Sequence, residues 1–312
     1  PNDLTSINVL CIGGGGGGGQ YISGKSWGSA GGGAGEVADA TLSFNRNVKY
    51  TMNVGDGGTN ANGESSSIQN GNNLVLEVFG GGRGGDNGYA TINQGVNPFY
   101  GSSGGSSGEK NNNNNHAVPA IAIRKNTPQN ITYYANSGGK GAQSYSPSED
   151  KDLASGGGGG GGALIGGAAA GGWEGGPGGD GRQWLDGEYY AGGGGGQGRG
   201  TTYANRQAGG KGGGGAAGRN GKPNYGGGGG ATGPSGSLDN GGQNKSVGGS
   251  GIIILKIPTN QLYYTPITDI NIHTAVDLWF SDPNNNTYGT NISTWNTSNV
   301  TNMNKLFNNK TS

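Results

Sequence analysis

The stretch Ile7-Asn8-Val9-Leu10-Cys11-Ile12 runs directly into seven consecutive glycines at positions 13–19. Its apolar and β-branched residues are typical of a buried strand. A glycine run has no side chain with which to do chemistry, so it offers only backbone, flexibility or very close packing. Further runs occupy 156–162, 192–196, 212–215 and 226–230, and 77 of the 312 residues are glycine. This pattern points to a scaffold and away from an enzyme.

Glycine runs bracketed by strands can order as polyglycine II, a left-handed helix with about three residues per turn and φ of about −75°. The helix has no internal hydrogen bonds, so its backbone groups point outwards and can bond to neighbouring helices. Plain disorder is the alternative, because glycine loses the most conformational entropy on ordering. The strands on either side of the runs favour ordered packing.

Composition limits the function classes. Hydrophobic residues make up 29% of the chain, against about 45–50% in ordinary globular domains. Lys and Arg number 19, as do Asp and Glu, so the chain lacks the basic footprint of a nucleic-acid partner. No apolar stretch approaches the ~20 residues of a membrane span. A lone Cys11 and two distant histidines, His116 and His273, predict no disulfide, no metal site and no cofactor.

Strand signals bracket the glycine-rich region. Alternation over residues 37–44 predicts a strand with its even-numbered side inward, and residues 48–54 alternate likewise, so the two are expected to form a hairpin. Residues 74–79 and 118–123 read as further strands, and residues 252–257 read as a closing, buried strand. The terminal strands predict one domain over residues 1–257 whose ends lie near each other, with residues 101–116 as a Gly/Ser/Asn-rich loop.

The segments 8–19, 50–58 and 249–254 together resemble glycine-rich domains of phage tail-fibre adhesins, bacterial surface proteins and proteins of large DNA viruses. In the phage adhesins, polyglycine helices stack into a sandwich whose loops bind host receptors. The resemblance implies an all-β, glycine-rich, β-sandwich-like domain with packed polyglycine-II segments.

The tail, residues 258–312, is expected to hold a linker and a small C-terminal repeat segment. Residues 292–307 are similar to the repeat of BspA-type surface proteins, which implies a leucine-rich-repeat-like solenoid. Val300, Met303 and Phe307 fall on one face of a predicted short helix, with Ile292 and Trp295 available to cover it. Because about three repeats are needed for a stable stack, this unit is expected to be the first of a truncated array.

A phosphate-binding pattern, G-x-x-x-x-G-K-[ST], occurs at residues 19–26. The motif requires a helix beginning at Lys25, and the glycine-rich residues that follow it cannot hold one. A chance match is therefore the preferred interpretation, and no nucleotide site is predicted.

Aromatic and acidic residues gather between two glycine runs. The candidate receptor or glycan contacts are Trp173, Trp184, Asp186, Glu188, Tyr189 and Tyr190. Sugars stack on aromatic faces and bond to carboxylates, and paired carboxylates also occur in glycosidases. Packing is the competing interpretation, because aromatics supply buried area that a glycine scaffold lacks.

Acceptor sites for N-linked glycans follow the pattern N-x-[ST]. They begin at Asn130, Asn244, Asn285, Asn291, Asn296, Asn299 and Asn309. An Asn/Thr-rich tail also produces such patterns by chance.

These observations predict a non-enzymatic structural or attachment protein on a virion surface or otherwise extracellular. The first choice, which rests on the resemblance of the domain and the tail alone, is a capsid-associated or fibre component of a large DNA virus of a protist or alga. A microbial cell-surface adhesin is the alternative, and a glycan-acting enzyme is the third reading. The expected partners are other virion or surface proteins, further copies of the chain, and a host glycan or receptor.

Overall fold

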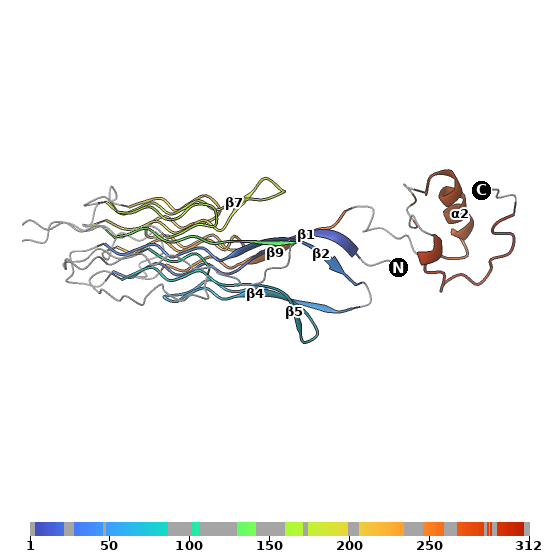
Figure 1. Cartoon of the computed structure of the whole chain (residues 1–312), viewed down its shortest axis with the longest axis horizontal. Helices are drawn as coiled ribbons and strands as arrows, with labels where there is room; N and C mark the ends of the chain where they lie inside the picture. The colour runs from blue at the N-terminus through green and yellow to red at the C-terminus, as the bar shows by residue number, and fades with distance from the viewer. Residues whose placement is uncertain are drawn as a thin grey trace, which may run out of the picture. The chain divides into compact units, whose positions relative to one another are not determined.

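The computed structural model describes residues 4–21, 28–45, 48–86, 101–105, 130–141, 160–170, 174–198, 206–233, 246–258, 267–283, 286, 288 and 292–308. The chain falls into two compact units. The larger unit holds residues 9–40 and 50–254, and the smaller holds residues 1–8, 41–49 and 255–312. Strands and extended glycine runs dominate the larger unit (Figure 1), which confirms the predicted all-β class.

The strands are β1 (Leu4–Ile12), β2 (Val37–Phe44), β3 (Tyr50–Asn53), β4 (Ser66–Asn70), β5 (Asn73–Val78), β6 (Ile131–Tyr134), β7 (Arg182–Gln183), β8 (Tyr189–Tyr190) and β9 (Ile252–Lys256). They form a four-stranded sheet in the order β6-β2-β1-β9, a three-stranded sheet β3-β4-β5 and the β7-β8 pair. The two terminal strands, β1 and β9, are hydrogen-bonded neighbours, as predicted. The even-numbered side of β2 is buried, which confirms the predicted alternation.

The predicted hairpin between residues 37–44 and 48–54 is wrong. β2 pairs with β6, where Val37 faces Tyr134, and β3 pairs instead with β4, where Met52 faces Ile68. The alternating pattern identified both strands correctly. It did not show that Met52 packs with the apolar residues of the β3-β4-β5 sheet instead of those of the four-stranded sheet. The strand predicted at residues 118–123 lies outside the described residues.

The first glycine run bonds to its neighbours with a period of three. The N–H groups of Gly13, Gly16 and Gly19 donate to the carbonyls of Glu36, Gly33 and Ala30, respectively. The N–H groups of Gly14 and Gly17 donate to Glu64 and Ala61 in a second segment. Those of Gly15 and Gly18 donate to Gly249 and Ser246 in a third segment. Every third glycine bonds to the same neighbouring segment, and each successive acceptor lies three residues earlier in that segment. These three segments are therefore antiparallel to the glycine run. A helix with about three residues per turn produces this pattern.

Carbonyl groups of the same run accept from three other segments. Gly81 and Gly84 donate to Gly14 and Gly17, Gly58 donates to Gly15, and Gly229 and Thr232 donate to Gly16 and Gly19. Among the described residues the run therefore has six hydrogen-bonded neighbours, and run 192–196 is surrounded in the same way. This arrangement confirms the predicted polyglycine-II packing and satisfies the backbone without a side-chain core.

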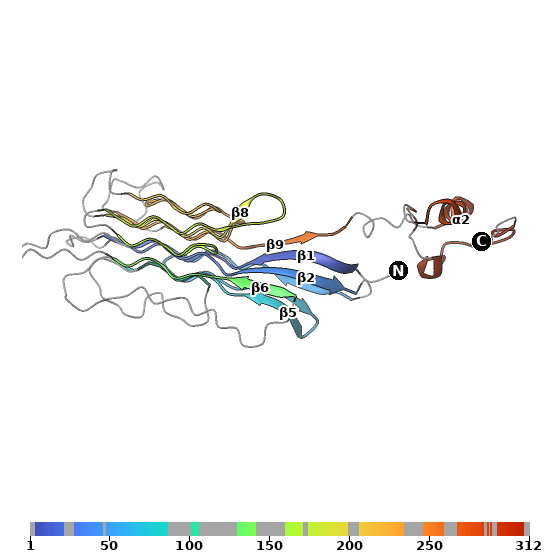
Figure 2. The same ribbon diagram turned by 45° about the horizontal axis from the view of Figure 1, so that its top comes forward.

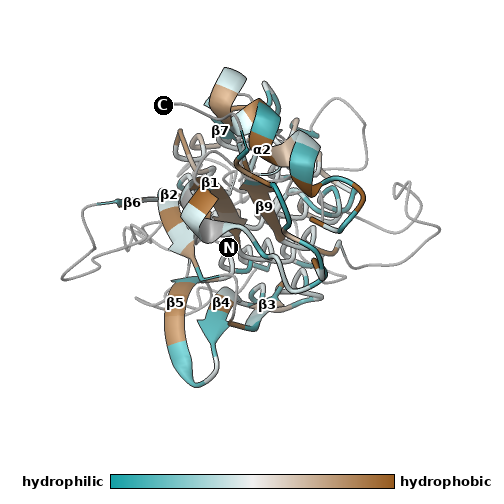
Figure 3. Cartoon of the chain, turned by 90° about the vertical axis from the view of Figure 1, so that its right-hand side faces the viewer, coloured by the Kyte–Doolittle hydropathy of each residue, from teal (hydrophilic) through white to brown (hydrophobic). Residues whose placement is uncertain are grey.

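The term glycine lattice is used below for residues 13–19, 30–36, 55–58, 61–64, 79–86, 160–163, 174–180, 191–197, 206–221, 226–232 and 246–251. Side chains form a core where the lattice meets the strands. Its buried members are Leu10, Ile12, Ala34, Val37, Ala163, Trp184, Tyr190 and Ala191. Figure 3 shows the hydrophobic residues of β1, β2 and β9 gathered in this region.

Ser66 joins the second sheet to the lattice. Its buried hydroxyl donates to the Ile12 carbonyl at 2.7 Å and accepts from the Gly55 amide at 2.9 Å. Ser66→Ala removes both bonds, so we expect the free energy of unfolding to fall by about 1–3 kcal/mol. Urea denaturation followed by circular dichroism measures this change, with the exposed Ser43→Ala as control. Identical midpoints for the Ser66 variant and the native chain would contradict the assignment.

The smaller unit holds helix α2 (Ile272–Ser281), the 3₁₀ turn η3 (Ile292–Thr294) and its own apolar cluster. The buried members of the cluster are Ile267, Ile272, Ala275, Val276 and Leu306. A parallel bridge joins Thr268 to Asn299. The predicted helical face at residues 300–307 is wrong, because turns occupy residues 304–308 and Met303 and Phe307 are 49% and 54% exposed. Leu306 enters the core in their place.

Asp269 links two parts of the smaller unit that lie far apart in the sequence. Its carboxylate accepts hydrogen bonds from the backbone amides of Thr301 and Asn302 at 2.7 and 2.9 Å. The Thr301 hydroxyl also donates to it, and this bond, then the two amides, lowers the pKa of the Asp269 carboxyl. A lowered pKa in the folded state adds stability that is fully present above the unfolded pKa of about 3.9.

We therefore expect the smaller unit to lose stability as the pH falls below about 4, through the folded pKa of Asp269. Asp269→Asn should weaken the unit at neutral pH and flatten this pH dependence. Amide NMR signals of Thr301 and Asn302, followed from pH 7 downwards, test the expectation. Signals that respond to acid equally in the native chain and in the variant would refute it.

Candidate functional site

The strands β7 and β8 form a short hairpin whose tip, residues 184–188, holds three of the six predicted contact residues, and β8 itself holds two more. The Trp184 amide donates to the Glu188 carbonyl, and the Gly187 amide donates to the Trp184 carbonyl, both at 3.0 Å. Gly187 has a φ of 86°, a left-handed conformation that glycine adopts without strain. Figure 2 shows the hairpin extending beyond the glycine runs that flank it.

Trp184 and Tyr190 belong to the core of the larger unit. Their exposed fractions are 7% and 6%, and the indole Nε1 of Trp184 lies 3.4 Å from Asp39 Oδ1, to which it donates. The Asp39 carboxylate also forms an ion pair with the guanidinium of Arg182 at 3.3 Å. The indole face of Trp184 is therefore used for packing and does not present an open stacking platform.

The two carboxylates of the tip are held by tyrosines. Asp186 accepts the Tyr190 hydroxyl at 2.8 Å and the Glu188 amide at 3.0 Å, while Glu188 accepts the Tyr225 hydroxyl at 3.4 Å. Burial raises the pKa of the Tyr190 phenol above its usual range, and the hydrogen bond to Asp186 raises it further. Tyr190 thus stays neutral and acts as a donor that fixes the tip.

Sequence reasoning missed the residues that complete this cluster. Tyr225 stacks on Tyr190 with ring centroids 5.1 Å apart, and Lys222 lies 3.8 Å from the centroid of the Tyr225 ring. Lys211 lies 5.7 Å from the centroid of Tyr189, which is half-buried. Lys211 belongs to the lattice, whereas Lys222 and Tyr225 lie in the short connection between its segments 206–221 and 226–232, and no local pattern in the sequence links the three residues to the tip.

The surface that the tip offers to a partner is consequently narrow. Leu185 is 53% exposed, and Asp186 and Glu188 are exposed beside it. Tyr189 adds a partly open ring. One apolar side chain, two acidic groups and part of a phenol can contact a partner, while the large aromatics support them from below.

Backbone hydrogen bonds also join several segments of the larger unit at the opposite end of the glycine runs. Hydrogen bonds between Gly85 and Gly105, Gln197 and Ser29, and Ala170 and Lys140 hold these segments together. Figures 1 and 2 show the glycine runs extending away from β7 and β8 toward this end.

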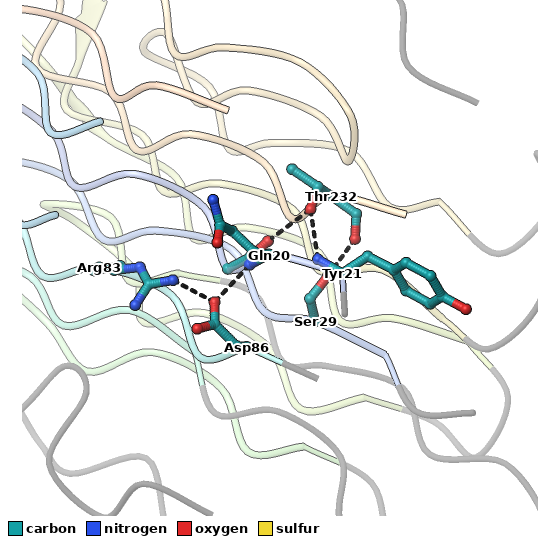
Figure 4. Close-up of polar contacts among 7 residues, drawn as sticks. Gln20, Tyr21, Ser29, Arg83, Asp86 and Thr232 are labelled. Atoms are coloured by element: carbon teal, nitrogen blue, oxygen red, sulfur yellow. Dashed lines mark hydrogen bonds and ion pairs between the residues drawn. The ribbon is translucent and has the colours of Figure 1, made fainter. Parts of the chain in front are cut away.

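A polar cap closes this end (Figure 4). Its members are Gln20, Tyr21, Ser29, Arg83, Asp86 and Thr232. The backbone amide of Gln20 donates to the Asp86 carboxylate at 2.7 Å, and the backbone amide of Tyr21 donates to the Thr232 hydroxyl at 2.8 Å. Arg83 pairs with the same carboxylate, Asp86. Side chains thus take the place of backbone acceptors here and satisfy these two amides.

The other predicted sites are only partly covered by the structure. Trp173 lies outside the described residues, as do Lys25 and the acceptor sites at Asn244, Asn285, Asn291 and Asn309. Asn130, Asn296 and Asn299 are exposed. Gly19, the first residue of the phosphate-binding pattern, donates to Ala30 and accepts from Thr232 within the lattice.

Within the described part of the chain, no group of three or more His, Cys, Asp or Glu side chains is placed to hold a metal ion. No helix among these residues is long and apolar enough to cross a membrane. A comparison with curated proteins finds no match. The glycine-rich domain family matches residues 1–258, which take in both the lattice and the strands that bracket it. The chain therefore belongs to the glycine-rich domain family.

Proposed function

We propose that this chain is a non-enzymatic structural and attachment protein on the surface of a virion. In this proposal it is a capsid-associated or fibre component of a large DNA virus of a protist or alga. The domain is the scaffold, and its two ends contact other virion proteins and a host glycan or receptor. A microbial cell-surface adhesin, also extracellular, is the second candidate, because the same scaffold suits both.

One observation carries the proposal: the glycine lattice bonds its own backbone into a closely spaced array. The run at residues 13–19 exchanges hydrogen bonds of 2.8–3.2 Å with six neighbours. Such an array holds the chain segments at fixed spacing with no need for a large side-chain core. A rigid support of this kind is suited to displaying contact residues such as those of the hairpin tip.

The hairpin tip supports a contact role better than a catalytic one. Asp186 and Glu188 are engaged by tyrosine hydroxyls and by a backbone amide, and both remain exposed to water. Catalytic carboxylates of glycosidases act in sites where one of them is kept protonated by its surroundings. We therefore place glycan contact ahead of glycan cleavage at this tip.

The smaller unit supports a surface role of the same kind. Its parallel bridge between Thr268 and Asn299 joins two successive segments, as expected for a BspA-like repeat. Met303 and Phe307 are exposed apolar residues that a following unit would cover. Asn296 and Asn299, the described acceptor sites of this unit, are exposed and therefore open to a glycosylating host.

Localisation of the chain tests the proposal most directly. Antibodies raised against the full chain, used with gold labels and cryo-electron microscopy of the native particle or cell, would locate it. Density among capsid subunits or on fibres supports the virion role. Label confined to a cell envelope favours the adhesin, and label confined to the cell interior would reject both.

The contact role of the tip has its own test. Fluorescent full chain is bound to host cells or to an immobilised glycan set, and compared with Leu185→Ala and Glu188→Ala variants. Both residues are exposed, so we expect weaker binding without a change in melting temperature. Glu77→Ala, on β5, is the control, and binding that is equal in all variants would remove the tip from the proposal.

A further inference from the structure

The strand β3 lies at one edge of its sheet. Among the described residues it pairs with β4 on one side, from Tyr50 opposite Asn70 to Asn53 opposite Ser67. Its last three residues are exposed, and Val54, which follows, is 47% exposed. Figure 3 shows β5, β4 and β3 in succession, with β3 at the margin. An edge strand presents backbone donors and acceptors that can pair with another strand.

The apolar face of this sheet is left unfinished at β3. Met52 faces Ile68, and Ile68 faces Leu76, so all three side chains lie on one side of the sheet. Ile68 and Leu76 are 0% and 2% exposed, whereas Met52 is 40% exposed. Tyr50 and Val54 alternate in phase with Met52 and share its side. One more strand would cover these residues as the others are covered.

We propose that β3 pairs antiparallel with β3 of a second copy of this chain, about a twofold axis that passes through Met52. The segment Tyr50-Thr51-Met52-Asn53-Val54 alternates apolar and polar residues, and this pattern is symmetric about Met52. Pairing sets Tyr50 opposite Val54 of the second copy, Met52 opposite its counterpart, and Thr51 opposite Asn53. An aromatic residue opposite a β-branched one is a favourable cross-strand pair.

Charge and register favour a second copy over an unrelated partner. The segment at residues 50–54 carries no charged residue, and the net charge of the chain is +0, so two copies meet without like charges opposed. The other edge of the sheet lacks this symmetry, because self-pairing of β5 would set Leu74 against Glu77. Twofold symmetric contacts require such a self-complementary surface.

Disulfide trapping tests the register. In the full chain, Met52→Cys would place two thiols opposite each other, with Cα atoms about 4.5–5.5 Å apart, within the usual disulfide range of about 4.4–6.8 Å. Leu74→Cys is the matched control, since Leu74 is exposed on β5 of the same sheet. The native Cys11 is fully buried. We expect a covalent dimer from Met52→Cys after mild oxidation, and only background from Leu74→Cys.

Sedimentation of the unoxidised protein tests the interface itself. We expect the native chain to form dimers as its concentration rises, Met52→Lys to remain monomeric, and Leu74→Lys to dimerise as the native chain does. Circular dichroism and melting temperatures confirm that the variants are folded. A native chain that stays monomeric at every concentration, a Met52→Lys variant that still dimerises, or equal cross-linking at both cysteine positions would each overturn the proposal.

Discussion

Replacing Gly16 by alanine should lower the melting temperature of the larger unit by roughly 10 °C, which corresponds to about 3 kcal/mol or more of lost stability. A β-carbon at this position would lie closer than 3.0 Å to backbone atoms of Gly81 and Gly82. Neither glycine can move aside freely, because Gly81 donates to Gly14 and Gly82 donates to Ser102. A single methyl group therefore separates two hydrogen-bonded segments.

Gly71→Ala is the control for this substitution. Gly71 has a φ of 57°, and no atom lies within 4 Å of the place that the alanine methyl group would take, so alanine meets conformational strain there without a clash. We expect a loss of about 1 kcal/mol, well below that at Gly16. Thermal denaturation of both variants measures the difference. Equal melting temperatures would show that the lattice yields to side chains and is not closely packed.

Replacing Trp184 by alanine should destabilise the larger unit by about 3–5 kcal/mol. Trp184 is 7% exposed and packs in a core with Leu10, Ile12 and Tyr190. Its removal leaves a cavity where the lattice has few other large side chains to fill space. Chemical denaturation and near-ultraviolet circular dichroism measure the loss.

Leu185→Ala separates packing from contact at the same hairpin. Leu185 is 53% exposed, so its truncation should change stability by less than about 0.5 kcal/mol. Any loss of host-surface binding in this variant therefore reports contact alone. A Trp184→Ala chain with native stability and abolished binding would reverse the assignment and make Trp184 the contact residue.

Local patterns in the sequence predicted several strands of the larger unit well and the partners of β2 and β3 poorly, and they missed helix α2. The alternation in β2 correctly placed Leu42 and Phe44 inside. The same kind of pattern in β3 gave a strand but not its neighbour, because pairing depends on which apolar face is completed, and Met52 joins Ile68. Strand partners separated by intervening segments carry no local signal.

Glycine content predicted the lattice, but not which runs adjoin. Gly15 bonds to Gly249 and Gly32 bonds to Gly229, yet no glycine run carries a mark that distinguishes it from another. Specificity comes from the side chains at the ends of the runs, such as the buried Ser66 and the Glu36 carboxylate, which accepts the Phe79 amide at 3.0 Å. Their importance emerges only when the distant segments are placed together.

In the candidate site, too, the sequence identified residues that are close together in the chain and missed those contributed by distant segments. Asp186 and Tyr190 are four residues apart, and the sequence correctly grouped them. Tyr225 and Lys211 reach the hairpin through the lattice, so local reasoning could not include them. Residue type alone also could not show that Trp184 is buried in the core while its neighbour Leu185 is exposed.

The period of three in the run 13–19 limits how such a domain can change in length. Deleting one residue from a run turns everything beyond the deletion by about 120° about the helix axis, so each later amide faces the wrong neighbour. Deleting three restores the phase and shortens the run by one turn. Insertions and deletions inside the lattice are therefore tolerated in multiples of three, whereas the connections between runs can vary in length one residue at a time.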